Sequence, residues 1–183
     1  MSVGLKRGIV QLEEHQTEWE ENARRTIELI RPLLEGLGAD IQHVGSTSIK
    51  TIKAKPIIDL VIGVKDFGQI LERNDALEKA GVIFRTDERP ASLLYVMGNF
   101  EKDTRTHHIH VVLLGSREWN NYLNFRDYLN ANPDEAASYE SIKEKMAELY
   151  PDDRTAYTDG KAALINELLE KAGKWRESIK ERL

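Results

Sequence analysis

The sequence of 183 residues contains no cysteine. Disulfides, zinc–thiolate sites, iron–sulfur clusters and cysteine nucleophiles are therefore excluded. Since a reducing compartment needs no disulfides, this composition fits a cytoplasmic protein. The sequence also lacks an apolar run long enough for a signal peptide or a transmembrane helix, so we expect a cytoplasmic location and no membrane partner.

An excess of basic charge is absent as well, because the formal net charge is −5. Broad binding to nucleic acid needs a basic surface that displaces counterions from phosphates, so a nucleic-acid partner is not expected. A local basic pocket is compatible with this charge. The hydrophobic and charged fractions, 40% and 31%, are those of an ordinary globular protein.

The chain length favours one domain, 1–183, with a mixed sheet over about 1–115 and a helical part over about 116–183. Apolar periodicity and turn residues predict a short strand or extended arm at 4–12, and strands at 41–44, 56–64, 82–86, 93–100 and 107–114. They also predict a helix that starts at Thr17, with a capping box between Thr17 and Glu20 and a kink or break at Pro32. Further helices are predicted at 66–80, 117–131, 133–150 and 158–180. A hairpin at Lys102–Thr106 should join the last two strands. The element order indicates the α+β class, a mixed sheet flanked by helices.

Asp59 lies inside the otherwise apolar strand PIIDLVIGV. An ionised carboxylate among apolar side chains costs several kcal/mol unless a cation or strong donors meet it. A bound metal or Lys55 would supply that charge. A purely structural ion pair with Lys55 or with an arginine from the helices explains the residue equally well.

The turn Gly45-Ser46-Thr47 precedes this strand. A strand that runs into Gly-Ser and a helical turn exposes backbone amides and hydroxyls, which favour an anion. The same turn is also simply a connection between two elements.

The segment RTHHIHVVLL contains three histidines, of which His108 and His110 alternate around Ile109 and His107 points to the other face. On a strand, His108 and His110 share one face at about 7 Å, which would let both imidazoles meet one metal or one phosphate. An exposed strand end is the alternative. Arg105 directly precedes the histidines and could neutralise an anion held there. Lys161 lies at a helix start, where it would face a phosphate or solvent. Arg126 and Asp127 are expected to form a surface ion pair.

These segments, HVGSTSI, KPIIDLVIGV, THHIHVV, GSREWNNYLNFRDYLNANPDEAASY and YTDGK, together resemble the GrpB family of the nucleotidyltransferase-like superfamily. The resemblance covers about residues 42–172. It implies a minimal nucleotidyltransferase fold in which a Gly-Ser turn binds phosphate and the next strand carries acidic metal ligands. Asp59 matches the first acid, whereas Val61 stands where the second would be.

The resemblance and the residues together suggest nucleotidyl or phosphoryl transfer from a nucleoside triphosphate to an unknown acceptor. Asp59, His108 and His110 would be the catalytic residues and would hold a divalent metal, Mg²⁺ or Mn²⁺ and in this ligand set also Zn²⁺. Phosphate charge would be met by Gly45, Ser46, Thr47, Lys55, Arg105 and Lys161. The partner would be a nucleotide or a phosphorylated small molecule.

Two other functions fit the same residues. Loss of the second acid at Val61 would leave a catalytically silent module that binds nucleotide or phosphate. A metal-dependent phosphoesterase would use the same aspartate and histidines. Whether the protein is an enzyme, and its oligomeric state, are left open by the sequence.

Overall fold

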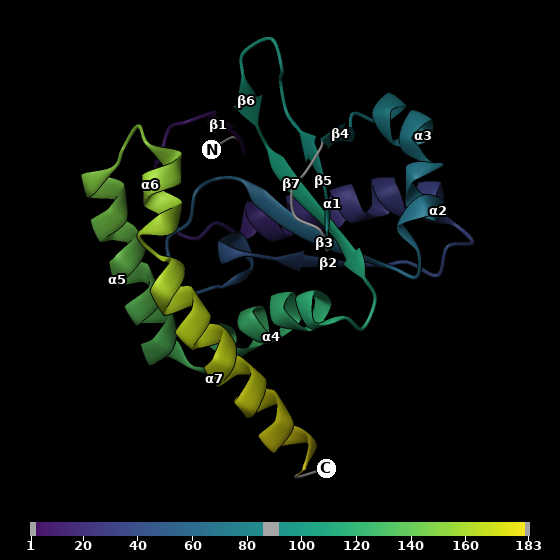
Figure 1. Ribbon diagram of the computed structural model, residues 1–183. Coiled ribbons are helices and arrows are strands. Elements are labelled where there is room, and N and C mark those ends of the chain that lie inside the picture. The colour runs from purple at the N-terminus through teal and green to yellow at the C-terminus, as the bar shows by residue number, and fades with distance from the viewer. Residues whose placement is uncertain (1–2, 86–91, 182–183) are drawn as a thin grey trace.

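A mixed five-stranded sheet forms the centre of the computed structural model, which describes residues 3–85 and 92–181 (Figure 1). Its spatial order is β2 (Asp40–Val44), β3 (Ile58–Val64), β7 (His107–Leu113), β5 (Leu93–Met97) and β4 (Ile83–Arg85). Strands β3 and β7 are parallel, and the other neighbours are antiparallel. Because helices flank this mixed sheet, the predicted α+β class is confirmed.

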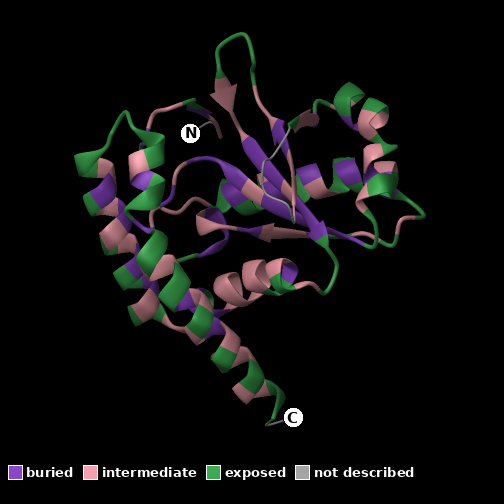
Figure 2. Cartoon of the chain, viewed as in Figure 1, coloured by how far each residue is buried: buried purple, intermediate pink, exposed green. Residues whose placement is uncertain are grey.

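The parallel strands β3 and β7 are buried on both faces, which explains their nearly continuous apolar sequence (Figure 2). Even-numbered residues of β3, such as Leu60 and Ile62, pack against α1 (Thr17–Ile30). The odd-numbered Val61 packs with Trp119 of α4 (Arg117–Ala131) on the opposite face. Since side chains alternate along a strand, Asp59 lies on the α4 face with Val61.

The helical C-terminal part also has a core of its own. Helices α4, α5 (Pro133–Leu149) and α7 (Ala162–Lys180) enclose the loop side chains Ile49 and Ile52. In Figure 1, α5, α6 (Arg154–Asp159) and α7 stand beside the sheet, near the start of β3. This arrangement places the C-terminal helices next to the Asp59 end of the strand.

Several predicted boundaries are wrong. The helix expected at 66–80 is two short helices, α2 (Phe67–Leu71) and α3 (Asn74–Lys79). The short strand or extended arm expected at 4–12 contains only the two-residue strand β1 (Leu5–Lys6), which pairs with β6 (Thr104–Arg105). The part of the 82–86 strand at Thr86 lies outside the described residues. The Lys102–Thr106 connection does join two antiparallel strands, β5 and β7, as predicted.

The predicted helix starts at Thr17, Arg117 and Pro133 are confirmed, whereas the capping box at Thr17 and the helix start at Thr158 are wrong. Gln16, not Thr17, occupies the N-cap of α1, and the Thr17 hydroxyl contacts Glu18 at 3.5 Å without forming the capping box with Glu20. Pro32 lies in a 3₁₀ turn, η1 (Arg31–Leu34), so the predicted break is correct. The helix expected at 158–180 begins at Ala162, after the separate α6 that Asp153 caps. In the described ranges, no helix is both long and apolar enough to span a bilayer.

Candidate functional site

Asp59 occupies the second position of β3, directly beside His108 of the parallel strand β7. Its Oδ1 lies 3.4 Å from His108 Nδ1, and its side chain is 28% exposed. Lys55, the alternative ion-pair partner, acts only at longer range. Neighbouring strands therefore bring the acid and the imidazole together, although they are far apart in the sequence.

The Asp59 carboxylate is ionised despite its burial. Burial alone raises its pKa, but the hydrogen bond and charge of His108, and then the charges of His110 and Lys55, outweigh burial and lower the pKa. Asp59 thus presents a negative charge to a site whose other charges are positive.

Gly45 explains how the turn reaches Asp59. The antiparallel pairing sets Val44 opposite Asp59, so the chain that leaves β2 passes over the carboxylate. A Cβ on Gly45 would overlap the Asp59 carboxylate and lie 2.8 Å from Asp59 Cβ. Gly45 also has φ +71°, a conformation that favours glycine. Both reasons require glycine where the turn crosses Asp59.

The turn that follows is held by short-range hydrogen bonds in η2 (Ser46–Ser48). Ser48 Oγ donates to the Gly45 carbonyl oxygen at 2.6 Å, and His43 Nε2 lies 2.9 Å from Thr47 Oγ1. Burial lowers the pKa of His43 to about 4, so this imidazole is neutral at pH 7. Ser46 Oγ lies 3.4 Å from the Tyr139 hydroxyl of α5, which links the turn to the helical part.

A cavity of about 220 Å³ opens between this turn, the start of β3 and the C-terminal helices. Of the residues predicted for the site, it is lined by Gly45, Ser46, Thr47, Lys55, Asp59, His108, His110 and Lys161. The structure therefore gathers all of them except Arg105 around one space. Of the described residues that line it, Asp59 carries the only carboxylate.

Arg105 lies elsewhere. Its guanidinium pairs with Asp103 at 3.6 Å and stacks over Phe100 at 4.7 Å. It lines a separate, much smaller hollow that also touches Lys55 and His108. The local ion pair and ring contact on the β6 hairpin hold Arg105 away from the main cavity.

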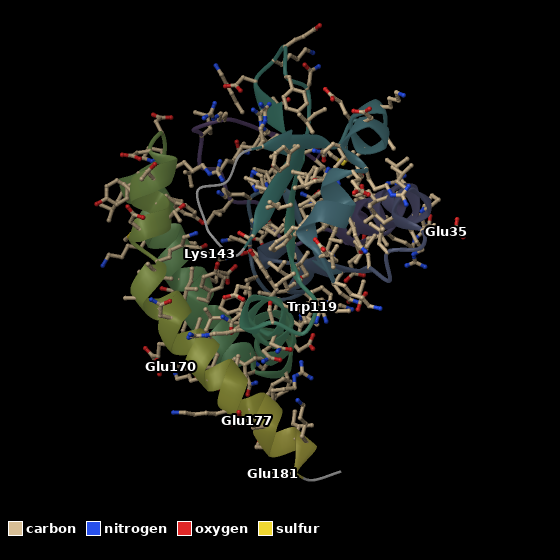
Figure 3. All side chains as sticks on the ribbon, turned by 45° about the vertical axis from the view of Figure 1, so that its right-hand side comes forward. Glu35, Trp119, Lys143, Glu170, Glu177 and Glu181 are labelled. Carbon is tan, nitrogen blue, oxygen red and sulfur yellow. The ribbon has the colours of Figure 1, made fainter. Side chains whose placement is uncertain are left out.

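Sequence reasoning missed Arg154, which lines the cavity from α6, together with Tyr139 and Phe125. Tyr139 and Lys143 are one helical turn apart on α5, and this spacing could have indicated one shared buried face. Lys143 lies on α5 (Figure 3), and its Nζ donates to the carbonyl oxygen of Lys53 in the loop before β3. No local signal marked Arg154, because only the tertiary fold carries α6 to the cavity.

Two basic side chains of the cavity, Lys55 and Lys161, lie over the ring of Tyr157. Lys161 Nζ lies 3.7 Å and Lys55 Nζ 5.1 Å from the centre of the Tyr157 ring. Burial, followed by the nearby charges of Lys55, Lys143 and Arg154, lowers the pKa of Lys161 to about 7. Burial and Arg154 also lower the pKa of Lys55. This group of cations favours an anionic ligand.

The site does not provide ligands for a pair of metal ions. Val61, at the position of the second acid, is fully buried against Val44, Val112 and Trp119. His110 stacks on Tyr122 with ring centres 5.2 Å apart. Across the described ranges, no cluster of three or more His, Cys, Asp or Glu side chains is placed to hold a metal ion. One carboxylate does not fit a two-metal centre, which needs bridging acids.

Arg126 and Asp127 do form the predicted ion pair, at 2.7 Å, but it belongs to a larger network. Arg126 Nη1 donates to the His43 carbonyl oxygen at 3.0 Å, and Asp127 also pairs with Arg176 of α7. These bonds tie α4 and α7 to the end of β2. They therefore support the turn that begins at Gly45.

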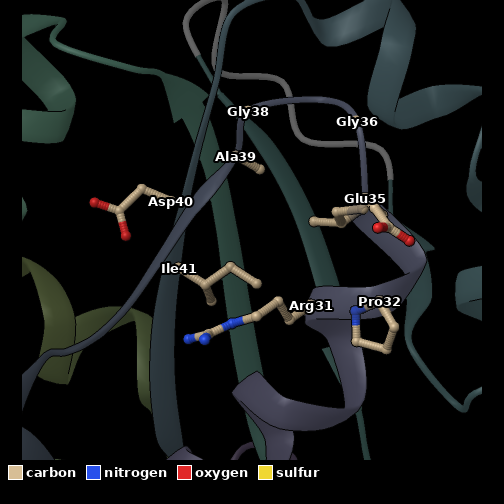
Figure 4. Close-up of a pocket in the computed structure, with 9 residues that line it drawn as sticks. Arg31, Pro32, Glu35, Gly36, Gly38, Ala39, Asp40 and Ile41 are labelled. Atoms are coloured by element: carbon tan, nitrogen blue, oxygen red, sulfur yellow. The ribbon is translucent and has the colours of Figure 1, made fainter.

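A second, larger hollow of about 640 Å³ lies between η1 and the outer strand β2 (Figure 4). Its charged side chains, Arg31, Glu35 and Asp40, carry mixed signs, and it contains no histidine. The residues that the sequence predicts for the site, except Arg105, therefore line the smaller cavity and not this hollow.

Comparisons with known proteins identify the family and the fold of the chain. Residues 9–171 match the GrpB protein family. The glutamate-rich protein GrpB of Alkalihalophilus pseudofirmus is 36% identical over 170 residues, which are 91% of this chain and 98% of the relative. The crystal structure of GrpB from Enterococcus faecalis superposes with a TM-score of 0.83 at 27% identity, covering 91% of this chain and 99% of that chain.

A more distant likeness concerns the fold alone. The Cid1 poly(U) polymerase, in a structure with MgGTP bound, superposes with a TM-score of 0.51 at 12% identity. The match covers 74% of this chain and 44% of Cid1. The chain therefore belongs to the GrpB family, and its mixed sheet has a nucleotidyltransferase-like fold.

Proposed function

We propose that the protein transfers a nucleotidyl or phosphoryl group from a nucleoside triphosphate to an acceptor that is still to be identified. The observation that carries this proposal is the single cavity in which the Gly45 turn and Asp59 face Lys55, Arg154 and Lys161. Cid1, which has a similar fold, is a polymerase described with MgGTP bound, and this agrees with a nucleotide as the ligand.

Each part of the cavity has a role in this proposal. The hydroxyls and exposed amides of the turn would donate to phosphate oxygens. Lys55, Arg154 and Lys161 would offset the charge that develops on the leaving phosphate. No side chain is an obvious covalent nucleophile, so the acceptor oxygen would attack phosphorus directly.

His108 is the candidate general base. If its Nδ1–H donates to Asp59, its Nε2 is free to take the proton of the acceptor hydroxyl. The acceptor oxygen then forms its bond to phosphorus, and the bond to the leaving phosphate oxygen breaks. Asp59 would orient the imidazole and stabilise the imidazolium that results.

Metal binding by Asp59, His108 and His110 stays a prediction, although the described residues form no cluster of three such ligands placed to hold a metal ion, and no step above depends on it. Elemental analysis of the purified protein, compared with a His108→Ala/His110→Ala variant, tests it directly. A bound divalent metal that this variant loses would support the prediction. Equal metal content in both proteins would contradict it.

A catalytically silent module that binds nucleotide or phosphate is the second candidate. It is favoured by Val61, whose burial against α4 leaves no carboxylate where the superfamily pattern has its second acid. In this case the cavity would bind the same ligand and release no product.

Turnover separates these candidates. The protein would be incubated with each of the four nucleoside triphosphates, with Mg²⁺, Mn²⁺ or Zn²⁺ in turn, and pyrophosphate and phosphate release would be measured. Release that is lost in Asp59→Asn, but kept in Asp40→Asn, supports an enzyme, because Asp40 is exposed on β2. Asp40→Asn should retain the wild-type unfolding midpoint, and Asp59→Asn, which loses the stabilising charge of Asp59, must still be folded at the assay temperature, as shown by a cooperative unfolding transition.

The other outcomes are equally decisive. Binding without release under any metal would favour the silent module. Absence of both binding and release would contradict the proposed function. Release that Asp59→Asn leaves unchanged would remove Asp59 from the mechanism.

A further inference from the structure

We infer that the cavity accepts the polyphosphate tail of its ligand and leaves sugar and base outside, so that inorganic tripolyphosphate is a sufficient ligand and the nucleobase is not distinguished. This inference rests on the proposed function, because both place phosphate against the Gly45 turn. It goes further in naming which part of a nucleotide is recognised.

The size of the cavity is the first argument. Its volume of about 220 Å³ lies below the range of roughly 300–1,000 Å³ that is typical of sites enclosing a whole small molecule. A chain of phosphates is the compact, charged part of a nucleoside triphosphate. The cavity therefore suits the tail better than the complete nucleotide.

Charge is the second argument. Three basic side chains reach the cavity from separate segments: Lys55 from the loop before β3, Arg154 from α6 and Lys161 from the start of α7. None of them forms an ion pair with a carboxylate in the described part of the chain, and Asp59 is the only acid at the cavity. Crowded cations with few counter-charges are stabilised by an anion that carries several charges.

The aromatic residues give the third argument, because their rings already have protein partners. Lys161 and Lys55 lie over the Tyr157 ring. Tyr139 meets Phe125 edge-on at 5.4 Å and has Lys143 Nζ 4.9 Å from its ring centre. Tyr157 and Tyr139 are also only 1% and 6% exposed, so a base that stacked on either ring would have to displace protein side chains.

The amide side chains that recognise adenine are also missing from the lining. Asn and Gln are the side chains that form paired hydrogen bonds with adenine, and neither type occurs among the described residues that line the cavity. The hydroxyls of Ser46, Thr47 and Thr158 accept and donate without such selectivity. The lining is therefore chemically suited to phosphate and offers no paired hydrogen bonds to adenine.

Calorimetric titration of the complete chain, without added metal, tests the inference with tripolyphosphate, the four nucleoside triphosphates and adenosine. We expect tripolyphosphate and all four nucleotides to bind within about threefold of one another, a spread of roughly 0.7 kcal/mol. Adenosine should show no binding. One nucleotide that binds more than tenfold tighter than tripolyphosphate would overturn the inference and leave the proposed function intact.

Failure of the proposed function looks different. If neither the nucleotides nor tripolyphosphate bind, both the proposed function and the inference are wrong. If all of them bind equally and none is turned over, the inference holds while the transferase proposal fails.

Charge-removing variants provide a second test. Arg154→Ala and Lys55→Ala should weaken tripolyphosphate and ATP by the same factor, about tenfold each, which is typical of a lost hydrogen bond to a charged group. Lys50→Ala is the matched control, because Lys50 is exposed and pairs with Glu20 outside the cavity. A variant that weakens ATP but not tripolyphosphate would show that the rest of the nucleotide is bound at these residues, and would refute the inference.

Discussion

Replacing Lys161 by methionine should stabilise the protein, and by an amount that depends on pH. Lys161 is 8% exposed, and its pKa falls from 10.5 to about 7 because of burial and neighbouring cations. Folding therefore requires either a charged amine in a crowded, buried position or the loss of its proton. Methionine has a similar unbranched shape and carries no charge.

The sign and size of the effect follow from the two pKa values. Between pH 7 and 10.5 the unfolded chain holds the Lys161 proton and the folded chain releases it, so the stability of the wild type rises with pH in this window. At 1.36 kcal/mol per pKa unit, the advantage of the variant is about 5 kcal/mol at pH 6 and falls to about 2 kcal/mol at pH 9. The difference between the two pH values, roughly 3 kcal/mol, is the quantity that tests the argument.

Urea unfolding of wild type and Lys161→Met at pH 6, 7, 8 and 9 measures this difference. Lys50→Met serves as the control, because its side chain is 69% exposed and its effect should not change with pH. A constant difference between wild type and Lys161→Met across this range would refute the lowered pKa and the crowding from which it is derived. The same variant should also bind tripolyphosphate more weakly, so that stability is gained and ligand affinity lost.

Three further changes test other parts of the structure. Gly45→Ala should destabilise the folded chain by about 1–2 kcal/mol because of its positive φ alone, and by more because the new Cβ overlaps Asp59. Gly81→Ala is the control in urea unfolding, because Gly81 also has a positive φ, +82°, but open space around its Cβ position. Equal losses in the two variants would contradict the overlap. Asp127→Ala should lower the free energy of unfolding by about 1–3 kcal/mol, because its two partly buried arginine partners lose their shared carboxylate. An unchanged unfolding midpoint would show that the network contributes no more than a surface ion pair. Val61→Asp should cost several kcal/mol because the new acid would be buried among apolar side chains, and a variant as stable as Val61→Ala would refute this packing.

Much of the site was predictable because its residues break local rules. Asp59 interrupts an apolar strand, and His108 and His110 alternate along another strand. Gly45 has no side chain and gives the backbone extra conformational freedom directly after a strand. Each anomaly has a cost that only a partner elsewhere can offset, so the sequence points to a site. The α+β class was equally accessible, because period-two and period-3.6 patterns are local properties.

Helix boundaries failed where two local signals competed. Asp153 and Thr158 are both acceptable cap residues, and apolar periodicity around Tyr157 does not show which one begins a helix. The break between α2 and α3 likewise has no proline or glycine to mark it. Tertiary packing of Ile70 and Leu77 on the core fixes these elements.

The sequence by itself determined that a lone acid, a Gly-Ser turn and two alternating histidines must be explained, because each is unfavourable or unusual in its local setting. Only the tertiary structure decided what faces them. The parallel pairing of β3 with β7 chose His108 as the partner of Asp59, and the docking of α6 and α7 brought Arg154 and Lys161 to the cavity while Arg105 stayed outside. The reason is that charges interact through space, so residues that are distant along the chain set the charge of the site only once the chain has folded.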